Sequence, residues 1–320
     1  MKVSVVLPAW KGKFLREAIG SILAQTFSDF ELLIVDDCSP EDIRGIVNSF
    51  PDPRIRYSRN GQNIGARDLA AAWNKAMENA RGEYAVLASD DDLYEKDFLS
   101  TLVALADEHK DISLFHSRVA FIDSAGLALG LSEERPEYET PAEFLFSRAV
   151  KRNWQFAPEF LFRVDRFRAI GGFVSFPRAW YSDDATWLKL AFEGGVIYSP
   201  RVLFRWRKSS DNISSLFSDL EDKLKAGFLY KRWIHEYINN LAAETNSEED
   251  LKILKLADSK VDGEIDHMAF WLFHNAKFQD SLRAFHHIKG GIGVKAAFAY
   301  SMFKIFLKKL VALVSRRIAK

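Results

Sequence analysis

The sequence predicts an α/β protein with a Rossmann-type, mostly parallel sheet flanked by helices, and with a C-terminal helical extension. Short apolar runs alternate with segments of helical periodicity through about the first hundred residues, an order typical of parallel sheets with helices on both faces. Three of the expected strands end in residues that can bind a ligand, at residues 8–10, 36–37 and 90–92, and such sheets bind ligands outside the carboxyl ends of their strands. After residue 215 no proline occurs and helical periodicity dominates, which indicates a helical region.

The first part of the chain supplies the strands and crossover helices that a parallel sheet requires. Apolar, β-branched runs predict strands over residues 3–7, 32–35, 54–59 and 83–89. Helical spacing of apolar side chains predicts helices over residues 13–26, 40–50 and 66–81. Because neighbouring parallel strands are joined by crossovers, these helices are expected to cover the sheet.

The middle of the chain is less regular. The apolar segment 113–123 favours a further strand. Residues 182–195 predict a helix that has Ser182 or Asp183 as its N-cap and ends at Gly194.

A change of character near residue 215 divides the chain into an expected α/β domain, residues 1–215, and a helical region, residues 216–320. Residues 294–320 place Phe, Leu and Val at helical spacing among Lys and Arg, and no acidic residue follows Asp280. A basic amphipathic helix of this kind is typical of peripheral membrane contact, here expected at the inner face of the plasma membrane. The alternative is a terminal helix that packs on the domain and keeps a solvated basic face.

Composition excludes several classes of protein. Lys plus Arg and Asp plus Glu each number 44, so the formal net charge is zero, whereas a dedicated nucleic-acid-binding protein is normally basic. The single Cys38 excludes a disulfide framework and fits a reducing compartment. No apolar run has the length of a membrane span, and the N-terminal run ends at Pro8, too early for a signal peptide. We therefore expect a cytoplasmic protein with no nucleic-acid partner.

The stretch ASDDDLY places Asp90, Asp91 and Asp92 side by side after an apolar run. Adjacent carboxylates repel one another unless water, a cation or hydrogen-bond donors compensate their charge. A solvated loop explains one such strand end, but expected strands also end in functional groups at residues 8–10 and 36–37. Three converging strand ends favour a shared site that holds a metal ion and a diphosphate.

Three segments resemble, in order and spacing, the motifs of family 2 glycosyltransferases of the GT-A fold. VSVVLPAWKGKFLREAIGSILAQTFSDFELLIVDDCS is similar to the opening of that family, and ARGEYAVLASDDDLY resembles its metal-binding strand end. YSDDATWLKLAFEGGVIYSPRVLFRWRKSSDNIS is similar to its acceptor-side segment, so the resemblance covers roughly residues 3–214. The resemblance implies that residues 1–215 are a catalytic domain that transfers a sugar from a nucleotide donor to an acceptor hydroxyl.

The resemblance assigns the acidic strand end to a metal and to the ribose. Asp91 matches the metal-contacting position, Asp90 matches the position that contacts the ribose, and Asp92 serves either the metal or the fold. Mg²⁺ or Mn²⁺ is the expected cofactor, because both prefer oxygen ligands and stabilise a departing diphosphate. The family's frequent Asp at the start of this motif is Ser89 here, which leaves fewer candidate ligands. The alternative is that the three carboxylates only cap a turn.

The other two strand ends match the nucleoside-binding positions of the family. Asp37 matches the residue that accepts a hydrogen bond from the base, whereas Asp36 either assists or orders the turn through backbone amides. Pro8 and Ala9 are expected to present backbone groups to the nucleoside. Trp10 stands where an aromatic ring can stack on the base.

Further positions concern the diphosphate. NGQNIGARD resembles the family's segment near the phosphates, so Arg67 either contacts phosphate oxygens or forms a surface salt bridge. Lys11 replaces the family's usual Asn beside the nucleoside. Ser209 replaces a family His, so a third metal ligand is not expected there, and Arg205 and Arg207 are candidates to neutralise the leaving diphosphate.

An inverting transfer requires a general base, because an acceptor hydroxyl is a weak nucleophile until a carboxylate takes its proton. In many family members an acidic pair precedes the motif xxxWLxL and supplies this base. Counting back from Trp187 places the base at Asp183, with Asp184 as the fallback. The alternative, that Asp183 caps the helix, does not exclude a role as base.

The expected partners are a nucleotide-sugar donor, with UDP favoured, and a glycan or lipid-linked acceptor of surface polysaccharide synthesis. Two other functions remain open. A nucleotide-sugar-binding module without catalysis shares the fold, but the intact Asp91 and Asp183 disfavour it. A nucleotidyltransferase also uses a parallel sheet with acidic metal ligands, but it normally has a glycine-rich basic loop after its first strand, which PAWKGKF does not resemble.

Overall fold

The computed structural model describes residues 1–209, 212, 219–276 and 280. Within these residues one sheet has the strand order β3-β2-β1-β4-β9-β6-β10-β5, with β7 paired to β6 and β8 paired to β10. The strands are β1 (Val3–Ala9), β2 (Phe30–Asp36), β3 (Ile55–Arg59), β4 (Tyr84–Leu87), β5 (Leu93–Tyr94), β6 (Leu114–Ile122), β7 (Ala128–Leu131), β8 (Tyr138–Glu139), β9 (Phe160–Arg163) and β10 (Val196–Arg207). The α-helices are α1 (Leu15–Leu23), α2 (Ile43–Asn48), α3 (Leu69–Met77), α4 (Phe98–Glu108), α5 (Pro141–Leu145), α6 (Val164–Ala169), α7 (Ser182–Ala191), α8 (Leu220–Glu244) and α9 (Glu248–Asn275). Shorter turns are the π-helical η1 (Phe146–Val150) and the 3-10 helices η2 (Ala157–Glu159) and η3 (Pro177–Ala179).

The N-terminal half of the sheet is parallel, as the sequence predicts. β1 pairs in parallel with β2 and with β4, and β2 pairs in parallel with β3. Every residue of β2 and β4 is buried, because helices cover both faces, and this burial explains their nearly continuous apolar runs. The strand ends predicted to meet therefore lie at one edge.

The other half of the sheet is mixed. β9 lies between β4 and β6 and is antiparallel to both, whereas β6 and β10 are parallel. β9 was not predicted from the sequence, because this strand has only four residues and shows no alternation.

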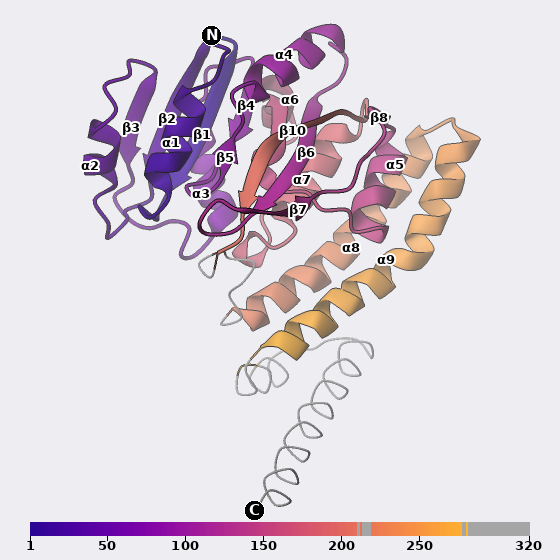
Figure 1. Ribbon diagram of the computed structural model, residues 1–320. Coiled ribbons are helices and arrows are strands. Elements are labelled where there is room, and N and C mark those ends of the chain that lie inside the picture. The colour runs from indigo at the N-terminus through magenta and orange to yellow at the C-terminus, as the bar shows by residue number, and fades with distance from the viewer. Residues whose placement is uncertain (210–211, 213–218, 277–279, 281–320) are drawn as a thin grey trace, which may run out of the picture.

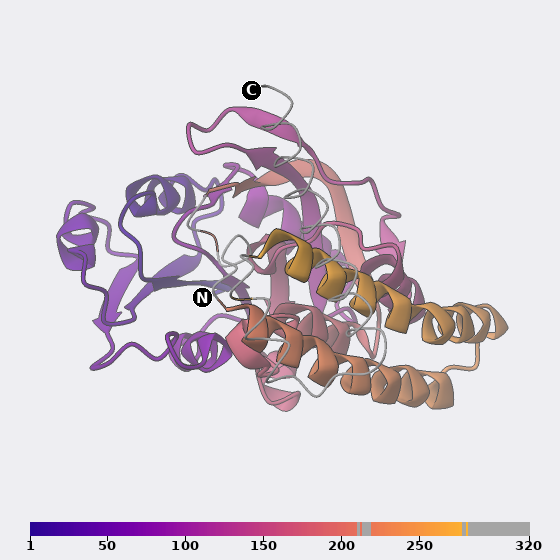
Figure 2. The same ribbon diagram turned by 90° about the horizontal axis from the view of Figure 1, so that it is seen from below.

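Helices lie in two layers, one on each face of the sheet (Figure 1). α1, α2 and α4 pack on one buried cluster, whereas α3, α5, α7, α8 and α9 contribute to the other. Figures 1 and 2 show α8 and α9 side by side. Their buried residues Ile234 and Val261 belong to the same cluster as Trp187 and Leu188 of α7. The division at residue 215 stays a prediction, and the described part of the helical region shares a core with the α/β part.

The start of α7 differs from the prediction. Its N-cap is Tyr181, which has a φ of 70° and makes no side-chain cap bond, so neither Ser182 nor Asp183 is the N-cap. The helix also ends before Gly194, at Ala191. The chain then turns through Gly195, whose φ is 77° and where a Cβ atom would lie 2.2 Å from the carbonyl oxygen of Glu139. Only glycine adopts this φ without strain and leaves room for the carbonyl oxygen of Glu139, because it has no Cβ atom.

Among the described helices, none combines the length and the hydropathy that a membrane crossing requires. The predicted amphipathic segment 294–320 lies outside the described residues.

Candidate active site

Asp90 joins the end of β4 to the end of β1. Its Oδ2 accepts hydrogen bonds from the backbone N–H groups of Trp10, at 2.9 Å, and Lys11, at 2.7 Å. Burial and the adjacent charge of Asp91 raise the pKa of Asp90 to about 6, against the opposing effects of Lys11 and the two backbone donors. Asp90 thus fixes the loop that follows β1, and its contact with a ribose stays a prediction.

Asp92 is turned into the protein. It is 3% exposed; one carboxylate oxygen accepts a hydrogen bond from the backbone N–H of Arg207, at 2.8 Å, and the other accepts one from the hydroxyl of Ser89. Burial and the charge of Asp91 raise the pKa of Asp92 well above its usual value. Of the two roles expected for Asp92, metal ligand or fold, these contacts favour the fold.

Asp91 is the member of the triplet that a bound cation can approach. Its side chain is 14% exposed and lies 3.4 Å from the ammonium group of Lys11. The described residues contain no group of three or more His, Cys, Asp or Glu side chains arranged to hold a metal. One carboxylate fits Mg²⁺ or Mn²⁺ at a diphosphate, where phosphate oxygens and water supply most of the ligands.

Arg207 supports the acidic loop from within the protein. Its side chain is 1% exposed. Its Nε donates to the backbone carbonyl of Asp91 at 2.8 Å, its Nη2 donates to Glu17 at 2.7 Å, and its guanidinium lies 4.3 Å from the ring centre of Phe14. Arg205, the other candidate for the diphosphate, is paired with Glu95. Either arginine would have to exchange these partners in order to bind a phosphate.

The end of β1 exposes an aromatic ring. Trp10 is 38% exposed, whereas Ala9 is buried and Pro8 is partly buried. The carbonyl of Ala9 accepts a hydrogen bond from the backbone N–H of Asp37 at 3.0 Å, and that of Trp10 accepts one from the hydroxyl of Ser39 at 2.6 Å. The indole is therefore the most available group of this strand end for a nucleoside.

Asp36 orders the turn after β2, which confirms the structural interpretation of this residue. It is fully buried. Its carboxylate accepts hydrogen bonds from the backbone N–H of Ser39 at 2.8 Å and from the hydroxyl of Tyr57 at 2.8 Å, and it also pairs with Arg59.

Asp37 holds the loop that follows β3. Its carboxylate accepts hydrogen bonds from the Asn60 side chain at 2.7 Å and from the backbone N–H groups of Ile64 at 3.0 Å and Gly65 at 2.7 Å. The segment with the predicted phosphate-binding residue thus folds around the predicted base-binding residue. Arg67 is exposed and forms no ion pair with any residue that the structure describes, so its surface salt bridge is not found there.

Asp184 is engaged in a bidentate ion pair. Its two oxygens accept hydrogen bonds from Nε of Arg148, at 2.5 Å, and Nη2 of Arg148, at 3.0 Å. The side-chain amide of Gln155 donates to Asp184 at 3.2 Å. Both oxygens of the Asp184 carboxylate are therefore occupied by donors of the protein itself.

Asp183 has a different environment one residue earlier. Burial and the charge of Asp184 raise the pKa of Asp183 to about 7, while the nearby Arg148 lowers it. Both aspartates lie in the first turn of α7, where the helix dipole favours negative charge. A carboxylate whose pKa is close to neutral is suited to take a proton from a hydroxyl.

Contacts between loops bring the start of α7 to the edge of the sheet where the predicted nucleotide-binding residues lie. Before α7, Ser175 donates to Asp68 at 2.8 Å, and Arg178 donates to the carbonyl of Ala66 at 3.1 Å. These partners flank Arg67 in sequence. The predicted base and the predicted phosphate-binding segment therefore belong to one surface.

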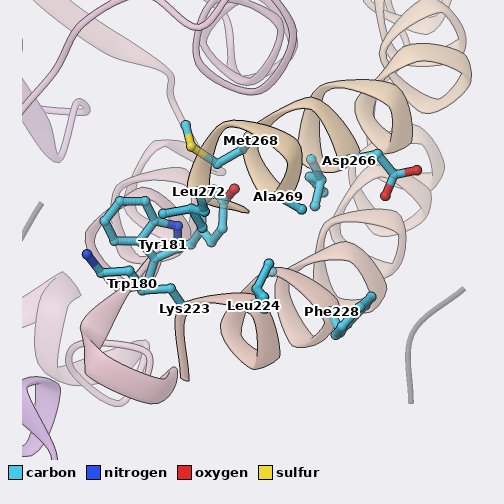
Figure 3. Close-up of a pocket in the computed structure, with 11 residues that line it drawn as sticks. Trp180, Tyr181, Lys223, Leu224, Phe228, Asp266, Met268, Ala269 and Leu272 are labelled. Carbon is cyan, nitrogen blue, oxygen red and sulfur yellow. The ribbon is translucent and has the colours of Figure 1, made fainter. Parts of the chain in front are cut away.

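A small pocket lies next to the start of α7, between this turn and the helices α8 and α9 (Figure 3). Trp180 and Tyr181 line one side, and Lys223 of α8 lies 4.6 Å from the ring centre of Trp180. Burial lowers the pKa of Lys223 to about 8. The ring of Tyr181 stacks on Tyr230 of α8, with centroids 4.4 Å apart and planes 3° apart. The C-terminal helices thus help to position the residues immediately before Asp183.

Sequence reasoning missed Arg148 and Gln155. Arg148 lies in the π-helical turn η1 and Gln155 in a loop. Both side chains hydrogen-bond to Asp184, from which they are separated in sequence by 36 and 29 positions, respectively. No local pattern marks such contacts, although a polar residue between Trp154 and Phe156 is a weak signal.

The fold agrees with the comparisons with known proteins. The profile of glycosyl transferase family 2 matches residues 4–171, which is more than half of the chain. The chain therefore belongs to glycosyl transferase family 2, which confirms the resemblance and the prediction of a transferase.

Particular relatives add detail. The putative teichuronic acid biosynthesis glycosyltransferase TuaG of Bacillus subtilis is 28% identical over 221 residues, covering 67% of this chain and 81% of TuaG. The putative colanic acid biosynthesis glycosyl transferase WcaA of Escherichia coli is 37% identical over 118 residues, covering 36% of this chain and 40% of WcaA. The match thus spans less than half the length of WcaA.

Solved structures confirm the fold. The structure of residues 1-349 of TarS from S. aureus has a TM-score of 0.65 and 18% identity, covering 94% of this chain and 81% of that chain. The mannosyltransferase PcManGT from Pyrobaculum calidifontis, solved with GDP-Man and Mn2+, has a TM-score of 0.55 and 16% identity, covering 98% and 83%, respectively.

Proposed function

We propose that the protein is an inverting, metal-dependent glycosyltransferase of cell-surface polysaccharide synthesis. It transfers a sugar from a nucleotide-sugar donor, with UDP favoured, to a hydroxyl of a glycan or lipid-linked acceptor. The observation that carries this proposal is the difference between two adjacent carboxylates. Asp184 is neutralised by Arg148, whereas the pKa of Asp183 is raised to about 7.

Asp183 is the proposed general base. The acceptor oxygen forms a bond to the anomeric carbon as its proton moves to the Asp183 carboxylate. The bond from that carbon to the diphosphate breaks on the opposite face and the diphosphate keeps the electron pair, so the configuration is inverted. Asp184 keeps Arg148 in place and is not the base.

The donor is proposed to lie along the ends of β1, β2 and β4. Trp10 stacks on the base, Asp37 and Asp90 hold the loops around the nucleoside, and Arg67 faces the phosphates. The proposed Mg²⁺ or Mn²⁺ is held by Asp91 and stabilises the charge of the leaving diphosphate when it is bound. Complexes of TarS with UDP-GlcNAc and of PcManGT with GDP-Man and Mn2+ support a nucleotide-sugar donor and a metal.

The proposed acceptor is supported by the names of the relatives, and the proposed cellular location by the basic C-terminal segment. The names of TuaG and WcaA refer to surface polymers, which supports an acceptor in surface polysaccharide synthesis. We propose a cytoplasmic enzyme whose basic segment 294–320 contacts the inner face of the plasma membrane. Full-length protein should then pellet with anionic vesicles and be released by high salt, whereas a chain that ends at Gly293 should not pellet and should still bind donor.

The proposed reaction is tested in two steps. A thermal-shift screen of nucleotide sugars with and without Mn²⁺ identifies the donor, since a ligand of the native state raises its stability. With that donor, Asp183→Asn should lower kcat by about 10²- to 10⁴-fold without weakening donor binding, and NMR should show an inverted anomeric centre in the product.

Asp184→Asn serves as the matched control. It should lower thermal stability, by about 2 kcal/mol for a lost charge-assisted hydrogen bond, with a smaller effect on kcat at a temperature where it is folded. Retention of configuration, or a larger kcat loss in Asp184→Asn than in Asp183→Asn, would contradict the mechanism. Donor binding without any turnover would favour a binding module.

A further inference from the structure

Four aromatic side chains form a continuous group beside the candidate active site, which we call the aromatic ladder: Phe121, Trp154, Phe156 and Trp206. Trp154 stacks on Phe156, with centroids 6.1 Å apart and planes 14° apart, and Phe156 stacks on Trp206 at 4.6 Å and 16°. Phe121 lies edge-on to the other three rings at 5.9 to 6.2 Å. Stacked and edge-on pairs of this kind are the favourable arrangements of aromatic rings.

The ladder ends in an exposed ring. Trp154 is 55% exposed, whereas the other three rings are partly buried. The ladder supports Trp154 from one side only, so a large apolar surface of the indole faces solvent. Exposed aromatic surface that is rigidly supported is typical of binding sites.

The main chain around Trp154 is fixed by the same groups that hold Asp184. Arg148 donates to the carbonyl of Asn153 at 3.1 Å, and Gln155 donates to Asp184 at 3.2 Å. The backbone N–H of Trp154 itself donates to Glu133 at 3.1 Å. Trp154 is therefore anchored to the ion pair that adjoins Asp183.

The opposite end of the ladder adjoins, along the chain, a residue that supports the acidic loop. Trp206 precedes Arg207, whose guanidinium donates to the carbonyl of Asp91. The ladder thus adjoins the residues that support the loop of the proposed metal ligand and those that hold Asp184, the neighbour of the proposed base. An acceptor must occupy the region between these two groups when its hydroxyl attacks the donor.

A sugar ring matches this surface. One face of a pyranose carries C–H groups with partial positive charge, which an indole face attracts, while its hydroxyls are hydrogen-bond donors. The Oε1 of Gln155, next to Trp154, is buried and accepts no hydrogen bond from the described residues. A bare lipid chain lacks hydroxyl donors, and an open-chain polyol lacks a flat C–H face.

We propose that the aromatic ladder is an acceptor subsite in which a pyranose ring stacks on Trp154, so that the acceptor ends in a sugar ring. This inference rests on the proposed function and specifies its acceptor class. Trp154 acts by binding the acceptor and not by taking its proton.

The test uses the full chain and small probes. Saturation-transfer NMR with methyl β-glucopyranoside, methyl β-galactopyranoside and methyl N-acetyl-β-glucosaminide should show transfer to ring C–H protons of at least one glycoside. Ribitol and dodecanol serve as ring-free probes and should show at most a tenth of that transfer. Trp154→Ala should weaken glycoside binding at least tenfold, and Trp154→Phe should retain part of it.

Two controls separate binding from folding. Trp271→Ala removes another exposed indole, 43% exposed on α9, and should not change glycoside binding. UDP binding, measured by thermal shift, should be the same in Trp154→Ala, Trp154→Phe and Trp271→Ala as in the unmodified chain.

Several outcomes would overturn the inference: no glycoside signal in the unmodified chain, equal binding by Trp154→Ala, or equal transfer to ribitol or dodecanol. Trp154-dependent glycoside binding in a chain that binds no nucleotide would keep the sugar subsite and reject the proposed donor chemistry.

Discussion

Two neighbouring aspartates at the start of α7, Asp183 and Asp184, lie in different electrostatic environments. The carboxylate of Asp184 accepts hydrogen bonds from Arg148 and Gln155, whereas burial and the charge of Asp184 raise the pKa of Asp183 to about 7. A base acts only in its ionised form, so kcat/KM of the unmodified enzyme should fall about tenfold per pH unit below pH 7.

Arg148→Gln should move this acidic limb of the pH–rate profile to higher pH. The positive charge of Arg148 lowers the pKa of Asp183, so its removal raises that pKa, and ionisation then requires a higher pH. Arg148→Lys keeps the charge and should leave the limb close to its original position. An unchanged limb in Arg148→Gln, in protein that still binds donor, would show that Asp183 does not titrate as the base.

Lys11 should compete with a metal ion for Asp91. Its ammonium lies 3.4 Å from the Asp91 carboxylate, so a divalent cation that binds there must displace it. Lys11→Met should therefore tighten Mn²⁺ binding up to about fivefold, as expected for loss of a partly exposed ion pair.

Titration calorimetry with Mn²⁺ alone measures this effect, and Lys13→Met is the control for a lysine two positions away. Weaker Mn²⁺ binding in Lys11→Met would mean that Lys11 does not oppose the metal.

Among the helices, α8 and α9 are joined by a charged contact. The two ring nitrogens of His235 face Asp258 at 2.5 Å and Asp262 at 2.9 Å, and Lys231 also pairs with Asp262. Partial burial lowers the pKa of His235, but the hydrogen bonds to Asp262 and Asp258 outweigh this effect, so the net pKa is raised. Both nitrogens donate only in the imidazolium form.

The contact should therefore stabilise the fold at low pH. Its contribution is complete below the ordinary histidine pKa of about 6.5 and is lost as pH rises through the raised pKa of the folded state. The difference in unfolding free energy between the unmodified chain and His235→Gln should shrink from pH 6 to pH 9, by less than about 1 kcal/mol because the side chain is partly exposed. Urea titrations measure this difference, with His267→Gln of α9 as control; a pH-independent difference would contradict it.

The elements that sequence reasoning located are those with a local signature. β1, β2 and β4 are marked by apolar runs, and the acidic triplet by its composition. The inward turn of Asp92 and the backbone contacts of Asp90 depend on Arg207 and Trp10, which are 115 and 80 residues away. The sequence therefore located the triplet but did not separate the contacts of its members. β9 was missed because it has only four residues and shows no alternation.

On the scale of the whole molecule, α8 and α9 complete the core of the α/β part. Tyr230 and Ile234 of α8 lie in the same buried cluster as Trp187 of α7. A chain that ends at residue 215 should lose this burial, at about 1.5–3 kcal/mol for each large apolar side chain, and should therefore unfold or aggregate.

A chain that ends at Ala276 keeps this cluster and should stay folded and bind donor. Circular dichroism melts of the two truncated chains compare them directly. A stable, donor-binding chain of 215 residues would show that the α/β part is independent.

The hydrogen bond between Arg207 and Asp92 also sets an order of events during synthesis. It joins residues that are 115 positions apart, and ribosomes add roughly 5–20 residues per second. The acidic loop leaves the ribosome many seconds before the strand that fixes it, so a nascent chain holds Asp90, Asp91 and Asp92 without their final geometry. The acidic loop takes its final form only when β10 has emerged and paired, long after the loop itself was synthesised.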